Sequence, residues 1–141
     1  MATYNKFQAF VEALAEKTHN LATDTLKVYL SNATPDAAAD AVYADLADIT
    51  PGNGYAAGGN VATQTSSSQT GGIYKLVLAD PATWTATGGS IGPFRYAVLY
   101  NFTTASGNLI GWWDYGTSIT LGAGDTFAVD FDPSTGVLTI Q

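Results

Sequence analysis

Residues 92–141 read GPFRYAVLY NFTTASGNLI GWWDYGTSIT LGAGDTFAVD FDPSTGVLTI Q, and this stretch decides the fold class. Four short apolar runs, residues 94–102, 109–115, 126–131 and 137–140, are separated by turns that carry Gly, Asn and Pro. Short strands between such turns are typical of β-sandwiches and barrels. The stretch contains no recognisable catalytic pattern. It therefore predicts a mainly β protein whose strands are built to pack.

The run 94–102 has apolar side chains on both faces of a strand. One face carries Phe94, Tyr96, Val98, Tyr100 and Phe102, whereas Ala97 and Leu99 lie on the other face. A strand that is apolar on both sides is covered on both sides. We therefore expect this strand at the centre of its sheet.

The C-terminal residues predict a hairpin. Residues 127–131 alternate apolar and polar side chains, Asp132-Pro133-Ser134-Thr135-Gly136 supplies a turn, and residues 137–140 return. A second turn of this kind is Gly122-Ala123-Gly124-Asp125.

The strands upstream complete the predicted fold. Residues 25–31 place Leu26, Val28 and Leu30 on one face and Lys27 and Tyr29 on the other, which predicts a half-buried strand. Residues 61–69, 73–79 and 84–87 predict three more. With no βαβ spacing, about eight strands favour a jelly-roll-like antiparallel β-sandwich over residues 24–141.

One amphipathic helix is expected before the first of these strands, over residues 5–21. Its apolar positions recur in steps of three and four residues: Phe7, Phe10, Val11, Leu14, Thr18 and Leu21. Thr3 or Asn5 caps the helix start, and the helix is expected to end near His19. Such a helix either covers one end of the sandwich or docks on a partner protein.

Residues 32–60 predict a loop excursion with, at most, a short helix. Within it, residues 51–59 read PGNGYAAGG and surround one large ring, Tyr55, which we expect to anchor the loop. This Gly-rich segment lacks the following Lys-Ser/Thr of a phosphate-binding loop, so nucleotide binding is disfavoured.

Composition excludes several classes of partner. The 141 residues fit a single domain, and 12 acidic against 5 basic residues give a net charge of -7, which disfavours nucleic acid and anionic membranes. Only 12% of residues are charged, and 19 Thr and 8 Ser supply polarity that a neighbour can cover at low cost. The absence of cysteine excludes disulfides and thiolate metal sites. The start of the chain does not resemble a cleavable signal peptide.

The groups that could carry chemistry have simpler structural interpretations. His19 is the only histidine, and a helix-capping role explains it better than catalysis. Asp125, Asp130 and Asp132 could ligate calcium, but turn and edge positions account for them. We expect no catalytic residue, cofactor or metal.

Trp112, Trp113 and Tyr115 are the candidate binding residues. Adjacent strand residues point to opposite faces, so burying one tryptophan tends to expose the other. Three interpretations remain open for an outward ring: covered core, protein interface and a stacking platform for a sugar. Tyr55 and Phe7 complete the set of expected partner-contact residues.

Several motifs together resemble small virion structural proteins of tailed bacteriophages. They are Tyr4-Asn5-Lys6-Phe7, Leu26-Lys27-Val28-Tyr29-Leu30, Gly52-Asn53-Gly54-Tyr55 with Gly58-Gly59, Ile91-Gly92-Pro93-Phe94-Arg95-Tyr96, Leu109-Ile110-Gly111-Trp112-Trp113-Asp114-Tyr115 and Phe131-Asp132-Pro133.

The resemblance implies a non-enzymatic capsid decoration, or cement, protein. Such a protein sits on the capsid exterior, stabilises the lattice of the major capsid protein, associates with itself as dimer or trimer, and is made in the host bacterial cytoplasm. Two alternatives remain: a carbohydrate- or receptor-binding β-sandwich module, and a tail or neck component of the virion.

Overall fold

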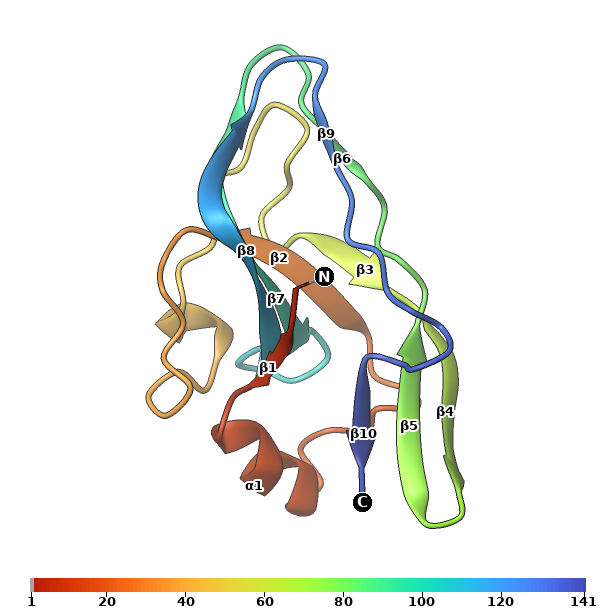
Figure 1. The fold of residues 1–141 in the computed structure, drawn as a ribbon. Coiled ribbons are helices and arrows are strands. Elements are labelled where there is room, and N and C mark those ends of the chain that lie inside the picture. The colour runs from red at the N-terminus through yellow and green to blue at the C-terminus, as the bar shows by residue number, and fades with distance from the viewer. Residues whose placement is uncertain (1) are drawn as a thin grey trace.

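The computed structural model describes residues 2–141 and is mainly β with one α-helix (Figure 1). The elements are β1 (Tyr4–Lys6), α1 (Ala9–Ala15), β2 (Leu26–Ser31), a 3-10 turn (Tyr43–Asp45), β3 (Asn60–Ala62), β4 (Gln64–Thr70), β5 (Ile73–Leu78), β6 (Trp84–Thr85), β7 (Ile91–Asn101), β8 (Leu109–Leu121), β9 (Thr126–Phe127) and β10 (Leu138–Ile140). The expected fold class is confirmed at this level. The 3-10 turn is the only helical turn within the predicted excursion 32–60.

All strand pairs are antiparallel, and they form three sheets. The largest has the order β1-β8-β7-β2-β3, a second has the order β10-β5-β4, and β6 pairs with β9. This arrangement is consistent with a β-sandwich, although the strand order does not establish a jelly roll. β7 lies between β8 and β2, so the prediction of a central strand is confirmed.

Apolar side chains cover the five-stranded sheet on both faces. Its inner face packs against the smaller sheets through a core that includes Leu26, Val28, Leu30, Leu76, Leu78 and Trp84. Its outer face carries Phe7, Tyr29, Leu46, Tyr96, Val98, Tyr100 and Leu109. The excursion supplies Leu46 to this outer cluster, and its backbone carbonyl accepts a hydrogen bond from the Tyr29 hydroxyl at 2.9 Å. β2 is therefore buried on both faces rather than half-buried.

One side chain of β7 lies on the opposite face from the prediction. Phe94 packs in the inner core with Ala97 and Leu99, whereas Tyr96 and Val98 face outward as expected. The β7–β8 register shifts between Phe94 and Tyr96. Such an irregularity changes the face that the following residues occupy, which strict alternation does not anticipate.

The helix is shorter than predicted. Residues 4–6 pair with β8 instead of starting a helix, with Tyr4 opposite Trp113 and Lys6 opposite Gly111. The chain leaves the helix at Lys17, whose φ of 67° is incompatible with a right-handed turn. Phe10 is buried, whereas Val11 is 51% exposed. Figure 1 shows α1 at the end of the molecule where the C-terminus lies.

The predicted C-terminal hairpin is wrong. β9 pairs with β6, with Phe127 opposite Trp84, and β10 pairs with β5, with Leu138 opposite Leu76. The turn itself is present, because the Gly136 N–H donates to the Asp132 carbonyl at 2.9 Å. It directs the chain from one small sheet to the next, a role that the local pattern of residues 127–140 does not distinguish from a hairpin.

In the part of the chain that the structure describes, no helix has the length and apolar character needed to cross a membrane.

Candidate functional site

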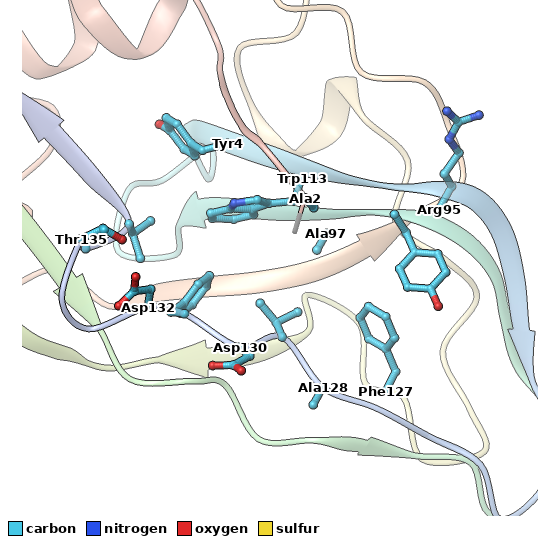
Figure 2. Close-up of a pocket in the computed structure, with 15 residues that line it drawn as sticks. Ala2, Tyr4, Arg95, Ala97, Trp113, Phe127, Ala128, Asp130, Asp132 and Thr135 are labelled. Atoms are coloured by element: carbon cyan, nitrogen blue, oxygen red, sulfur yellow. The ribbon is translucent and has the colours of Figure 1, made fainter.

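A groove lies between the five-stranded sheet and the chain segment that follows β9 (Figure 2). Its volume is about 340 Å³. Five of its lining residues are aromatic and come from three parts of the chain: Tyr4, Trp113, Tyr115, Phe127 and Phe131. We call this feature the aromatic groove. Pockets lined mainly by aromatic side chains with a few polar groups are the usual binding sites of proteins.

Strand pairing brings these rings together. Tyr4 lies opposite Trp113 in the β1–β8 pair, and their ring centroids are 5.5 Å apart. The ring of Phe131 lies 5.3 Å from that of Trp113, and the ring of Phe127 lies 5.9 Å from that of Tyr115. Trp113 and Tyr115 are two residues apart on β8, so they point to the same face. The rings therefore form two groups along the groove, Tyr4, Trp113 and Phe131 in one and Tyr115 and Phe127 in the other.

The charged groups of the groove are unevenly distributed. Arg95 forms a two-point ion pair with Asp114, with N–O distances of 2.7 and 2.8 Å. The Arg95 guanidinium lowers the pKa of the Asp114 carboxyl. Asp130 and Asp132 lie along the segment after β9, which forms the other wall (Figure 2). Arg95 is paired with Asp114 and forms no ion pair with Asp130 or Asp132. The wall that carries these two residues is therefore acidic.

Asp132 has a structural task within its turn. Its Oδ1 accepts hydrogen bonds from the Ser134 N–H at 2.8 Å and from the Ser134 hydroxyl at 2.6 Å, and these bonds lower the pKa of the Asp132 carboxyl. Asp130 has no such partner among residues 2–141 and is exposed. Asp130 is thus the carboxylate of this wall that is available to a bound cation.

The two tryptophans lie on opposite faces of β8, as alternation predicted. Trp113 lines the aromatic groove, whereas the ring of Trp112 lies 4.5 Å from that of Phe7 on the outer face. Both are partly buried. Tyr115 is 56% exposed and is the most accessible of the three candidate residues.

Phe7 and Tyr55, the other two candidate contact residues, lie in the interior. Phe7 is 0% exposed and Tyr55 is 3% exposed. In this conformation neither offers surface to a partner. The expectation that Tyr55 anchors its loop is met, because its hydroxyl bonds Asp48 at 2.5 Å and the N–H of Leu30 at 3.0 Å.

Asp48 organises the excursion around Tyr55. Its carboxylate also accepts hydrogen bonds from the Tyr43 hydroxyl at 2.6 Å and from the Gly58 N–H at 2.7 Å. Burial, followed by the hydrogen bond to Asp48, raises the pKa of Tyr55 and keeps its ring neutral. This cluster stabilises the loop and is not arranged around an open pocket.

His19 does not cap the helix, because α1 ends at Ala15. It is 5% exposed, and its Nδ1 lies 3.1 Å from the Asn101 side-chain nitrogen, which also donates to Asp24 at 2.6 Å. Burial lowers the pKa of His19 below its ordinary value, and the charge of Asp24 partly opposes this. His19 is therefore a buried polar side chain beneath the loop after β7.

No group of three or more His, Cys, Asp or Glu side chains within the described residues is arranged to hold a metal ion. The three aspartates near the C-terminus do not converge into such a group.

The sequence pattern identifies two of the five aromatic residues of the groove and misses the other three. Trp113 and Tyr115 were expected to contact a partner, but Tyr4, Phe127 and Phe131 were not. The sequence pattern places Tyr4 just before the predicted helix, and the other two in a hairpin that does not form. The apolar alternation of residues 127–131 indicates an extended segment with one apolar side. It does not indicate that this side faces Trp113 and Tyr115 of β8.

No family model, no curated protein and no solved structure matches this chain.

Proposed function

We propose that this chain is a non-enzymatic virion structural protein of a tailed bacteriophage, of the capsid decoration or cement type. It binds the exterior of the assembled capsid, stabilises the lattice of the major capsid protein, and is synthesised in the host bacterial cytoplasm. The aromatic groove carries this proposal, because it offers apolar contact area on a body with few charges. A jelly-roll-like fold is part of the same proposal.

The groove suits a segment of a partner protein. Aromatic residues that lie in a pocket supply most of the binding energy of protein interfaces. Trp113 and Tyr115 present one face of such a contact, and Phe127 and Phe131 the other. Asp130 adds a negative charge at the wall, so the fitting segment carries apolar side chains flanked by a basic residue.

Many weak contacts are sufficient for a decoration protein. Each copy that binds the assembled lattice, but not its loose subunits, shifts the equilibrium toward the assembled state. Repetition over the shell multiplies this effect. A low charge density also favours close neighbours, because Thr and Ser are cheaper to cover than ions.

The test uses capsids that lack this protein. We expect purified protein to co-sediment with them and to raise their resistance to heat. Tyr115→Ala removes an accessible ring of the groove and is expected to weaken co-sedimentation. Phe102→Ala is the matched control, since Phe102 is 55% exposed but outside the groove. Failure of the unsubstituted protein to bind or stabilise capsids contradicts the proposal. If the labelled protein is found on the tail or neck of the virion, it is a component of that part and not a capsid decoration protein.

A carbohydrate- or receptor-binding role is the second candidate, and the rings of Trp113 and Tyr115, which both line the groove, favour it. Sugar rings stack on aromatic faces, and Asp130 could accept hydrogen bonds from hydroxyl groups. A glycan array separates the two functions. Saturable sugar binding that Trp113→Ala abolishes, while Trp112→Ala retains it, favours the carbohydrate role.

A further inference from the structure

β4 is an outermost strand with a free edge. It ends the order β10-β5-β4, and Figure 1 shows it at the outer side of the molecule. It is seven residues long, and its sequence is Gln64-Thr65-Ser66-Ser67-Ser68-Gln69-Thr70. The β3 strand before it also ends its own sheet. A long edge strand presents unpaired backbone groups that can pair with another chain.

The register shows which backbone groups are free. The Leu76 carbonyl accepts a hydrogen bond from the Val137 N–H at 2.8 Å, so it points toward β10 and away from β4. Ser67 lies opposite Leu76. In an antiparallel pair, residues opposite each other direct their N–H and C=O groups either both toward the partner or both away. Ser67 therefore directs its backbone groups to the free edge, and alternation places those of Gln69 there too.

No hydrogen bond from elsewhere in residues 2–141 reaches the backbone N–H or C=O of Ser67 or Gln69. Water satisfies these groups in an isolated copy, and the backbone of a second strand can replace that water.

Charged side chains, prolines, bulges and covering loops are the usual devices that protect an edge strand. β4 carries neither a charge nor a proline, and its one irregularity is a register shift between Gln64 and Ser66, at the start of the strand. No Asp, Glu, Lys or Arg occurs between Asp48 and Lys75, a run of 26 residues that includes all of β4. The chain as a whole carries a charge of -7, which repels a second copy. No side chain of β4 adds to this repulsion, and the one charged residue of the neighbouring strand β5 is Lys75, opposite Ser68.

We propose that two copies of this chain pair through their β4 edges, antiparallel and about a two-fold axis at Ser67. Ser67 then faces Ser67 of the second copy and exchanges both backbone hydrogen bonds with it. Ser66 faces Ser68, and the regular pairing ends at the register shift between Gln64 and Ser66. All these side chains are neutral, so the edge is complementary to itself, as a two-fold interface requires.

A second copy fits this edge better than a different protein does. In a two-fold pair the same seven residues form both sides, and small hydroxyl side chains leave no unpaired charge at the axis. The Ser66 and Ser68 hydroxyls, 3.3 Å apart on the exposed face, lie next to the same pair in the second copy. The Ser67 hydroxyl bonds the Tyr74 hydroxyl at 2.8 Å within its own sheet and leaves the axis open.

This inference goes beyond the capsid proposal, and purified protein tests it without capsids. Light scattering at increasing concentration is expected to report a mass approaching twice 14.7 kDa. We expect two double variants, Ser66→Lys with Ser68→Lys and Ser66→Glu with Ser68→Glu, to weaken the dimer. Each is expected to raise its dissociation constant at least about tenfold. The lysine pair makes the net charge of the chain less negative and the glutamate pair makes it more negative. Loss of the dimer in both double variants therefore identifies repulsion at the edge and not an effect of net charge.

Thr139→Lys with Gln141→Lys is the matched control, since both residues are exposed, Thr139 belongs to β10 at the opposite end of the same sheet, and Gln141 directly follows that strand. This control is expected to retain the dimer. A thermal unfolding scan of each variant verifies that it is folded. Retention of the dimer in either β4 variant, or its loss in the control alone, overturns the proposal. A protein that stays monomeric up to about 1 mM, the weak end of specific association, also overturns it.

A cysteine variant tests the register. The chain has no cysteine, so Ser67→Cys introduces the only thiol. Residues in a hydrogen-bonded antiparallel pair have Cα atoms about 5.5 Å apart, within the reach of a disulfide. Mild oxidation is expected to cross-link Ser67→Cys efficiently and Ser66→Cys poorly, because residue 66 faces residue 68. Cross-linking of Ser66→Cys in preference to Ser67→Cys contradicts the proposed axis.

Discussion

The hydroxyl of Tyr55 donates a hydrogen bond to Oδ1 of Asp48 at 2.5 Å. The Tyr55 hydroxyl oxygen also accepts a hydrogen bond from the backbone N–H of Leu30 at 3.0 Å. Tyr55 and Asp48 belong to the excursion, whereas Leu30 belongs to β2 in the sheet. The Tyr55 hydroxyl therefore connects the excursion to β2 of the five-stranded sheet. Leu46, which belongs to the outer cluster, lies in the same excursion.

Tyr55→Phe is expected to lower the free energy of unfolding by about 1–3 kcal/mol, because it leaves the buried Leu30 N–H without a partner. Tyr115→Phe is the control and is expected to change stability by less than about 0.5 kcal/mol, since its ring is exposed and its hydroxyl bonds no described residue. Urea unfolding measures both. Equal losses in the two variants contradict the anchoring role of Tyr55.

Gly59 is required by a close approach of two backbones. Its φ is +67°, and a Cβ atom there would overlap the Val28 carbonyl oxygen and lie 2.6 Å from the Tyr29 Cα. Gly59→Ala is expected to destabilise the fold by about 2–4 kcal/mol, from the left-handed conformation together with the overlap.

Gly71→Ala separates these two causes. Gly71 has a similar φ of +61°, but its added Cβ would meet no atom within 4 Å. This control is expected to cost only about 1–2 kcal/mol. If thermal denaturation shows the same loss of stability for Gly59→Ala and Gly71→Ala, the overlap with Val28 does not contribute to the destabilisation.

The sequence located strands well because the signal for a strand is local. The predicted segments 25–31 and 73–79 agree with β2 and β5 to within one residue at each end. Alternation of apolar residues reports that a segment is extended and which side is apolar, and both are properties of a few neighbouring residues. It does not report which strand lies next to it.

Partner choice explains the errors. Residues 5 and 6 belong to the predicted helix because Phe7 and Phe10 fit a helical stripe, but residues 4–6 pair with β8 instead. The segment after β9 was read as half of a hairpin. β9 itself pairs with β6, and in the segment after it the Phe131 N–H donates a hydrogen bond to the Asp80 carboxylate at 2.7 Å. These contacts join residues far apart in the chain, so no local pattern reveals them.

The same limit applies to the aromatic groove. Trp113 and Tyr115 could be selected because two adjacent tryptophans on a strand cannot both face one core. Tyr4 and Phe131 could not, because they line the groove only after two distant segments fold against β8. Phe7 could not be told from a contact residue, since burial of an aromatic ring depends on what covers it.

The burial of Phe7 gives a direct test of its role. Phe7→Ala removes a ring that is 0% exposed and packs against Trp112, so it is expected to cost about 3–5 kcal/mol. Val11→Ala, at a position that is 51% exposed, is expected to cost less than about 0.5 kcal/mol. A large effect at Val11 would favour the longer helix of the sequence prediction, and a small effect at Phe7 would favour its expected role as a partner-contact residue.

His19 makes the stability of the fold depend on pH. Burial lowers its pKa in the folded state below the ordinary value of 6.5, so the folded protein binds this proton less readily than the unfolded chain. Its contribution to stability is complete above about pH 6.5 and is lost as the pH falls toward the folded-state pKa. The slope of stability against pH cannot exceed about 1.4 kcal/mol per pH unit for one proton.

The variant His19→Asn tests this dependence, because asparagine keeps an acceptor for the Asn101 side chain but does not titrate. Since His19 is the only histidine, urea unfolding between about pH 7.5 and about pH 5 is expected to show a falling stability that this variant flattens. An unchanged slope in His19→Asn means that another group titrates in this range.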